Sequence, residues 1–181
     1  MNQGRAVFRF SLTVWMVTVP LLFGQSDDQV CAPCHARETA AFLKSRMGNS
    51  IAPPAPLGQG NVTRKASRIE ISISDRDGRM IHSLTQSGLT AEYPVAYQIG
   101  AGKIGFTYIV RIGEYLFESP ASWYRQHGWD LSPGYQHMPA VDFDRLIDSP
   151  CLFCHADNGK FVGSDGHRFS GVELKPIGCD R

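Results

Sequence analysis

Two short cysteine motifs constrain this chain more than any other feature of its sequence. Residues 31–35 read CAPCH and residues 151–155 read CLFCH, with 115 residues between them. C-x-x-C-H is the attachment pattern of c-type haem. Two thiols on one helical turn can both form thioethers with one porphyrin, and the next residue then points its imidazole at the iron. The pattern therefore predicts two covalent haem c groups. We expect thioethers at Cys31, Cys34, Cys151 and Cys154, and iron ligands at His35 and His155.

Three other interpretations of the paired cysteines stay open at this point. A zinc ribbon also uses two C-x-x-C pairs, but its pairs usually lie closer together and need no histidine after each. A thioredoxin-like redox site needs a surrounding βαβ unit, which the pattern here does not offer. Two local disulfides would suit an oxidising compartment but would leave both histidines unexplained.

The fifth cysteine is Cys179, which only Asp180 and Arg181 follow. Cys-Asp-Arg has the layout of the first three residues of another C-x-x-C-H motif. We therefore expect the chain to be the N-terminal part of a longer protein, with a third haem attached at Cys179. The alternative is a true C-terminus that carries a thiol.

The first residues have the layout of a secretory signal. Arg5 and Arg9 precede an apolar run of 14 residues, 10–23. A membrane span needs about 20 apolar residues. We therefore expect a signal peptide over residues 1–24, and one haem-bearing domain over residues 25–181 in the periplasm or another exported location. An uncleaved membrane anchor is the alternative, and after cleavage we expect no stable membrane insertion.

Charge gives a further exclusion. The chain carries 18 basic and 17 acidic side chains, for a formal net charge of +1. No polycationic surface follows from this balance, which argues against nucleic acid as a partner.

The expected fold class is α+β, with short haem-bearing helices flanking a small antiparallel β-sheet and many irregular loops. Good helix formers predict a first haem helix over residues 30–46, and Pro150 suits the start of a second. A short helical turn is expected over 142–148, and loops or irregular structure over 48–66 and 120–141. Alternating apolar and polar residues predict a strand over residues 68–74, and a turn at residues 75–78 predicts that 80–86 returns as its hairpin partner. Residues 93–99, 106–112 and 115–118 are further expected strands.

The glycines of residues 100–105 match G-x-G-x-x-G, a dinucleotide-binding pattern. Such a site needs a helix directly after the glycines. The β-forming run that follows favours a glycine turn instead.

The sixth iron ligand of an electron-carrying haem is usually His or Met. His137 lies in a loop rich in Pro and Gly shortly before the second motif, so it could fold over a haem. Met47 follows the first haem helix and could turn back toward the iron. His82 is a third candidate, although its place on a predicted strand also fits an ordinary half-buried residue.

Several segments together resemble a known family. They are CAPCHARETAAF with RMGNS, YQIGAGKIGFTYIV, LFESPASWY with WDLSPGY, CLFCHADNG and the closing IGCDR. They resemble the N-terminal part of a secreted bacterial multihaem cytochrome c of the cytochrome c554-related kind. The chain departs from some of these proteins at Lys103, where they carry a histidine.

The resemblance implies electron transfer in the periplasm with redox partner proteins. It also allows a second function, a multihaem oxidoreductase acting on a small nitrogen or sulfur species at an open haem. No catalytic residue set stands out in the sequence, so we expect an electron carrier rather than an enzyme.

Overall fold

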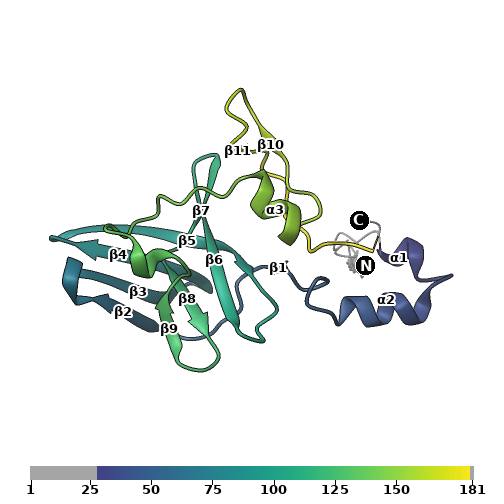
Figure 1. Cartoon of the computed structure of the whole chain (residues 1–181), viewed down its shortest axis with the longest axis horizontal. Coiled ribbons are helices and arrows are strands. Elements are labelled where there is room, and N and C mark those ends of the chain that lie inside the picture. The colour runs from purple at the N-terminus through teal and green to yellow at the C-terminus, as the bar shows by residue number, and fades with distance from the viewer. Residues whose placement is uncertain (1–27, 180–181) are drawn as a thin grey trace, which may run out of the picture.

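The computed structural model describes residues 28–179, so the predicted signal peptide lies outside the described residues. Helices α1 and α2 open the described chain, strands fill most of the middle, and α3 follows (Figure 1). None of the helices in residues 28–179 is long and apolar enough to cross a membrane. In chain order the elements are α1 (Asp28–Cys31), α2 (Ala36–Leu43), β1 (Ile51–Ala52), β2 (Gly60–Arg64), a 3-10 turn (Lys65–Ser67), β3 (Ile69–Arg76), β4 (Arg79–Gln86), β5 (Leu89–Ile99), β6 (Gly105–Ile112), β7 (Tyr115–Glu118), β8 (Ala121–Tyr124), β9 (Gly128–Leu131), a second 3-10 turn (Tyr135–His137), α3 (Ser149–His155), β10 (Phe161–Val162) and β11 (Arg168–Phe169).

Most of the strands join one antiparallel sheet that nearly closes into a barrel. Across the described residues this sheet has nine strands, in the hydrogen-bonded order β2-β3-β4-β5-β6-β8-β9, and β1 pairs with β5 while β7 pairs with β6. The two ends of this order approach each other. A Cβ atom added to Gly60 of β2 would lie 2.0 Å from the Trp129 ring of β9. A residue without a side chain at position 60 is therefore what lets the two edges meet.

The five predicted strands are confirmed as β3 to β7, with shifts of a few residues at their ends. The predicted hairpin between the first two is also confirmed. Arg76 and Arg79 are paired across a two-residue loop. In this loop Asp77 has φ 56° and Gly78 has φ 74°. Positive φ at both positions is the geometry of the tight hairpin turn that Asp-Gly favours.

The predicted balance of helix and sheet is wrong. The large sheet dominates, and short helices lie beside it instead of flanking a small one (Figure 1). The helix expected over residues 30–46 is interrupted after Cys31 and ends at Leu43. Pro33 contributes to the interruption, because proline has no N–H to donate within a helix.

The prediction also missed strands in segments that were expected to be irregular. The 48–66 segment contains β1 and β2, and the 120–141 segment contains the β8–β9 hairpin, in which Trp123 pairs with Trp129. Aromatic side chains favour strands, and here they outweigh the nearby Pro and Gly. Residues 142–148 form no helical turn. Their backbone runs beside β7 instead, and Ile147 N donates to Leu116 O at 2.8 Å.

The hydrophobic core has two parts, which lie on opposite faces of the sheet. Strand β6 contributes to both, because successive side chains of a strand point to opposite faces. Tyr108 and Val110 belong to the core inside the barrel, whereas Ile109 belongs to the outer core. Leu152 of α3 also lies in the outer core. The second cysteine motif is therefore built onto the outside of the barrel.

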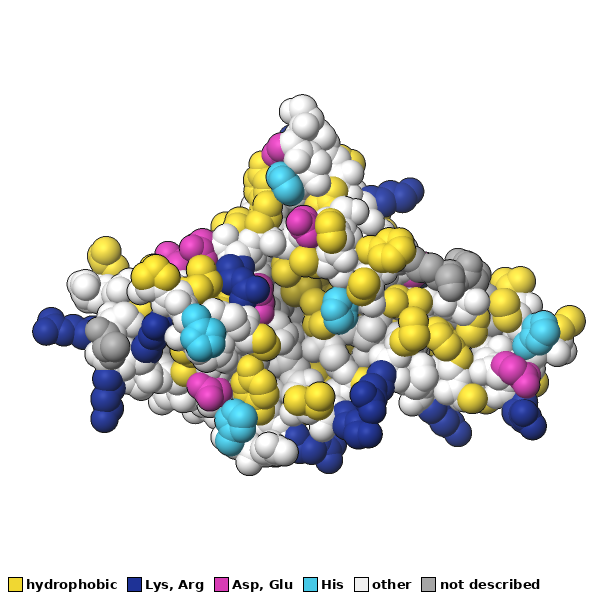
Figure 2. Space-filling model, in the orientation of Figure 1, with side chains coloured by type: hydrophobic (Ala, Val, Ile, Leu, Met, Phe, Trp, Pro, Cys, Tyr) yellow, Lys and Arg dark blue, Asp and Glu magenta, His cyan; other side chains and the backbone are white. Residues whose placement is uncertain are grey.

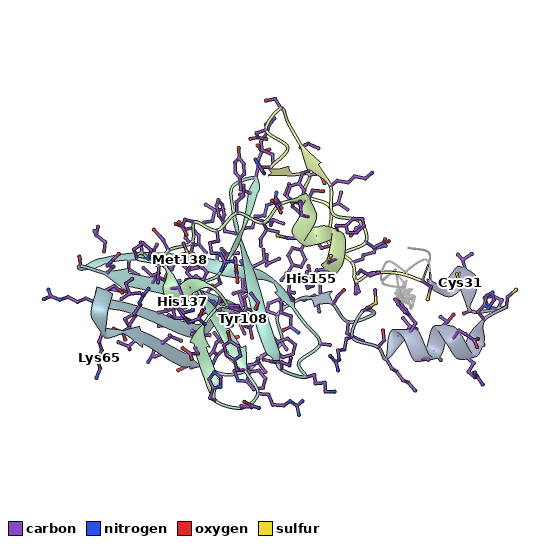
Figure 3. The ribbon with its side chains drawn as sticks, in the orientation of Figure 1. Cys31, Lys65, Tyr108, His137, Met138 and His155 are labelled. Atoms are coloured by element: carbon purple, nitrogen blue, oxygen red, sulfur yellow. The ribbon has the colours of Figure 1, made fainter. Side chains whose placement is uncertain are left out.

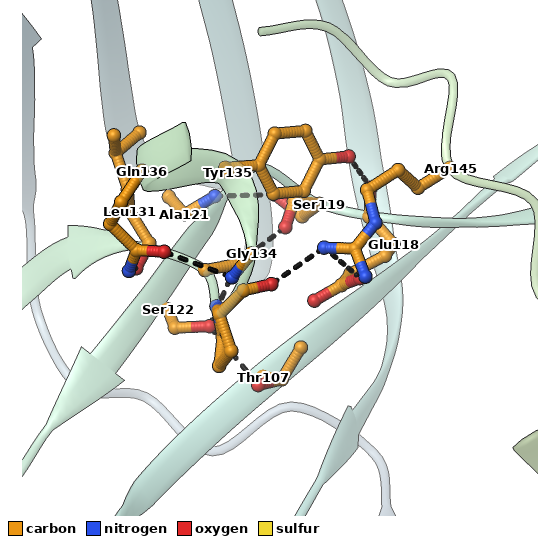
Figure 4. A network of polar contacts seen from close by, with 12 residues as sticks. Thr107, Glu118, Ser119, Ala121, Ser122, Leu131, Gly134, Tyr135, Gln136 and Arg145 are labelled. Atoms are coloured by element: carbon orange, nitrogen blue, oxygen red, sulfur yellow. Dashed lines mark hydrogen bonds and ion pairs between the residues drawn. The ribbon is translucent and has the colours of Figure 1, made fainter. Parts of the chain in front are cut away.

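A polar network fixes the loop between β9 and α3 against the barrel (Figure 4). Arg145 pairs with Glu118 at 2.9 Å and donates to the Pro133 carbonyl at 2.6 Å. The Tyr135 hydroxyl donates to the carbonyl oxygens of Glu118 and Asp142 at 3.2 and 3.0 Å. These bonds satisfy backbone groups that the irregular loop would otherwise leave unpaired.

Candidate functional site

The first motif lies at the junction of two short helices. Cys31 ends α1, and His35 is the residue before α2. The His35 N–H donates to the Cys31 carbonyl at 2.8 Å, and the Thr39 N–H donates to the His35 carbonyl at 2.9 Å. The motif therefore forms a tight turn in which Cys31 is half-buried and Cys34 and His35 are exposed.

The second motif lies on α3, as predicted. Asp148 caps this helix by accepting from the Cys151 N–H at 3.4 Å, and Pro150 occupies its first turn. Leu152 is 2% exposed and anchors the helix in the outer core. Both thiols, on Cys151 and Cys154, are exposed. The helix thus buries Leu152, while both cysteines and the apolar Phe153, which is 66% exposed, lie at the surface.

A hydrogen bond ties the second motif to the segment that follows the first. Ser50 is buried, and its Oγ donates to the His155 carbonyl at 2.7 Å across 105 positions of sequence. The same Oγ accepts from the Ile177 N–H at 3.5 Å. Because Ser50 directly precedes β1, this bond fixes the end of α3 beside the edge of the sheet.

A cavity of about 490 Å³ lies beside the first motif. Cys31 and His35 line it, together with Met47 and Cys179. The cavity therefore brings two residues that are distant in sequence to the first motif. Met47 is a candidate sixth iron ligand, and Cys179 is the cysteine expected to begin a third motif. The volume lies within the range of about 300 to 1,000 Å³ that is common for ligand and cofactor sites.

A second cavity, of about 290 Å³, lies beside the second motif. Cys154 and His155 line it, and so do Met47 and Ile104. Burial lowers the pKa of His155, which favours the neutral imidazole that binds metals. Met47 lines both cavities, so the two sites adjoin at this side chain.

The structure does not bring the other two candidate ligands to these cavities. His137 is exposed in the 3-10 turn after β9, and Figure 3 shows it over the barrel and away from His155. His82 is completely buried inside the barrel, where its Nδ1 is hydrogen-bonded to Ser119 Oγ at 2.7 Å. Neither histidine is among the residues that line the cavities beside the motifs.

The residues at both sites fit covalent haem. Cys31, Cys34, Cys151 and Cys154 are thiols outside any disulfide, as thioether formation requires. Each motif places its histidine on a cavity that also has apolar lining. A bare metal ion fits less well, because no group of three or more His, Cys, Asp or Glu in the described part of the chain is placed to hold one.

Sequence reasoning missed several residues of the second site. The cavity beside Cys154 is also lined by Arg46, Ser50 and most of the glycine loop, namely Gly100, Ala101, Lys103, Ile104 and Gly105. They lie about 50 to 110 positions before the motif in sequence, so no spacing pattern connects them to it. The glycine loop leads directly into strand β6 and not into a helix, which is inconsistent with a dinucleotide site.

Comparison with known proteins adds no relative: no family model, no curated protein and no solved structure matches this chain.

Proposed function

We propose that this protein is an exported c-type cytochrome that transfers electrons in the periplasm. Covalent haem would supply the chemistry, a reversible one-electron change between ferric and ferrous iron. The chain would hold one haem through Cys31 and Cys34 and another through Cys151 and Cys154. His35 and His155 would bind the two irons, and redox partner proteins would deliver and remove the electrons.

The observation that carries this proposal is the arrangement of the two motifs in space. They are 115 residues apart in sequence, yet each opens onto a cavity and the two cavities share Met47. An electron carrier with two cofactors benefits from such adjacency, because electrons can then pass directly between neighbouring groups. A structural role for the cysteines gives no reason for this placement.

The intact mass of the protein tests the proposal directly. After expression in a host that attaches haem c, each covalent haem adds roughly 600 Da to the polypeptide. We expect two added groups in the wild-type chain and one in each of two double variants, C31S/C34S and C151S/C154S. C179S is the matched control and should keep two. A wild-type mass equal to that of the polypeptide alone would refute the proposal.

Spectroscopy of the same preparation separates electron transfer from the oxidoreductase alternative. Six-coordinate, low-spin iron in both haems is expected for an electron carrier. High-spin iron in one haem would show an open position where a small nitrogen or sulfur species binds, and would favour the enzymatic function.

A further inference from the structure

Three basic side chains lie at the cavity beside the second motif or at the neighbouring one. Arg46 and Lys103 line the cavity beside Cys154 and His155. Arg46 also lines a neighbouring cavity of about 310 Å³, together with Lys44. We call Lys44, Arg46 and Lys103 the basic rim. Figure 2 shows Lys and Arg side chains gathered below the hollowed centre of this face.

The positive charge of the basic rim is not compensated within the described chain. All three side chains are exposed, and none of them has an ion-pair partner in residues 28–179. The described residues that line the two cavities include no Asp or Glu. The whole chain has a net charge of only +1, so the rim concentrates positive charge on one face of a nearly neutral molecule.

Exposed apolar side chains accompany this charge. Met47 is 55% exposed and Ile104 is 74% exposed, and both line the second cavity. Exposed apolar residues with a charged border are the usual composition of a protein interface. The first cavity differs, since its described lining includes Glu38 and no Lys or Arg.

We propose that the basic rim is the docking surface for an acidic redox partner protein, and that electrons enter or leave this chain at the second motif. The inference rests on the proposed function, because it names the partner class and the entry point for that same site. Complementary charge steers such a partner to the rim and raises the association rate. One electron would then pass between the partner and a haem held at Cys151 and Cys154, with no bond formed or broken.

A plant-type [2Fe–2S] ferredoxin, an acidic low-potential protein, is the probe for this surface. Its reduced cluster gives up one electron, and one ferric haem of this chain is reduced to ferrous. The second-order rate constant is measured by stopped flow at about 0.01 M and about 0.15 M salt, where the Debye length is about 30 Å and about 8 Å. We expect the wild-type rate to fall steeply with added salt.

Two charge-matched double variants localise the effect. R46Q/K103Q removes two charges of the basic rim, and K65Q/R68Q removes two exposed charges at the far end of the sheet, where Lys65 is labelled in Figure 3. R46Q/K103Q should lower the low-salt rate roughly tenfold and flatten its salt dependence. K65Q/R68Q should leave the low-salt rate constant and its salt dependence near the wild-type values.

Two results would overturn the proposal. Equal losses in the two double variants would show a general charge effect. A wild-type rate constant that is the same at both salt concentrations would show that the charge of the rim is already neutralised. Pairing of Arg46 and Lys103 with haem propionates would have this effect.

An NMR titration separates this surface from the proposed function. Oxidised ferredoxin is added to the oxidised, ¹⁵N-labelled full chain, and we expect the largest amide shifts in residues 44–47 and 100–105. The titration needs no haem, so it tests the docking surface even if the mass measurement shows none. Shifts confined to other parts of the chain would reject the rim as the interface.

Discussion

Mild acid should destabilise this protein through His82. The side chain is fully buried, its ring is in edge contact with Tyr108 and Trp129, and its Nε2 has no hydrogen-bond partner in the described chain. A proton added at Nε2 would place a charge in an apolar core without an acceptor. Burial accordingly lowers the pKa of His82 from 6.5 to about 3.

The sign and size of the effect follow from linkage. The unfolded chain binds a proton near pH 6.5 and the folded chain does not, so stability is lost as the pH falls from 6.5 toward 3. Each pH unit within this window costs about 1.36 kcal/mol. Because the onset is gradual, acidification from pH 7 to pH 5 should lower the free energy of unfolding by about 2 kcal/mol through this one residue. Ser119, the hydrogen-bond partner, does not titrate in this range.

Urea unfolding followed by tryptophan fluorescence, at pH values from 7 to 5, measures this loss. The loss in the wild-type chain is compared with that in H82Q, whose side chain cannot titrate. H82Q is expected to be less stable than the wild-type chain at pH 7. On acidification to pH 5, its free energy of unfolding should fall by about 2 kcal/mol less than that of the wild-type chain. H137Q, which changes an exposed histidine outside the core, is the control for the histidine-to-glutamine exchange itself. Parallel pH profiles for wild-type and H82Q would refute the argument.

Three further substitutions test how the sites are held on the barrel, and urea unfolding measures each. Leu152→Ala leaves a cavity at a buried position under the second motif and should lower the free energy of unfolding by about 3 kcal/mol. Ser50→Ala removes the 2.7 Å bond to the His155 carbonyl and should cost about 1 kcal/mol, with faster amide exchange at the end of α3. Gly60→Ala forces a Cβ atom into Trp129 and should cost about 1 to 3 kcal/mol, with a change in tryptophan emission.

The sequence predicted the central strands well because they obey local rules. Residues 69–74 alternate between buried and more exposed side chains, and Asp77-Gly78 supplies the tight turn. Periodicity of two and turn chemistry are properties of neighbouring residues, so they can be read without a fold. The near-closure of the barrel could not be predicted in this way. It depends on the approach of Gly60 to Trp129, two residues that no sequence pattern connects.

At the candidate site, too, local patterns could be predicted from the sequence, and contacts between distant residues could not. The spacing of cysteine and histidine within each motif is local, so it can be recognised without a fold, and the haem attachment that it indicates stays a prediction. His82 was named as a ligand candidate on residue type alone, but the strand alternation that was also noted for it describes its place in the barrel better. Its burial is deeper than the half-buried position expected. Arg46 and Lys103 meet beside Cys154 only through tertiary structure.

The turn after α2 explains how the cavities beside the two motifs come to share a side chain. The Gly48 N–H donates to Ser45 Oγ at 3.1 Å, and Asn49 Nδ2 donates to the Leu43 carbonyl at 2.8 Å. A Cβ atom at position 48 would lie 2.6 Å from the Phe42 carbonyl oxygen, so only glycine permits a turn this tight. The turn places Met47 on the wall of both cavities. The adjacency of the two cavities therefore depends on a short local structure, which the larger barrel supports but does not itself form.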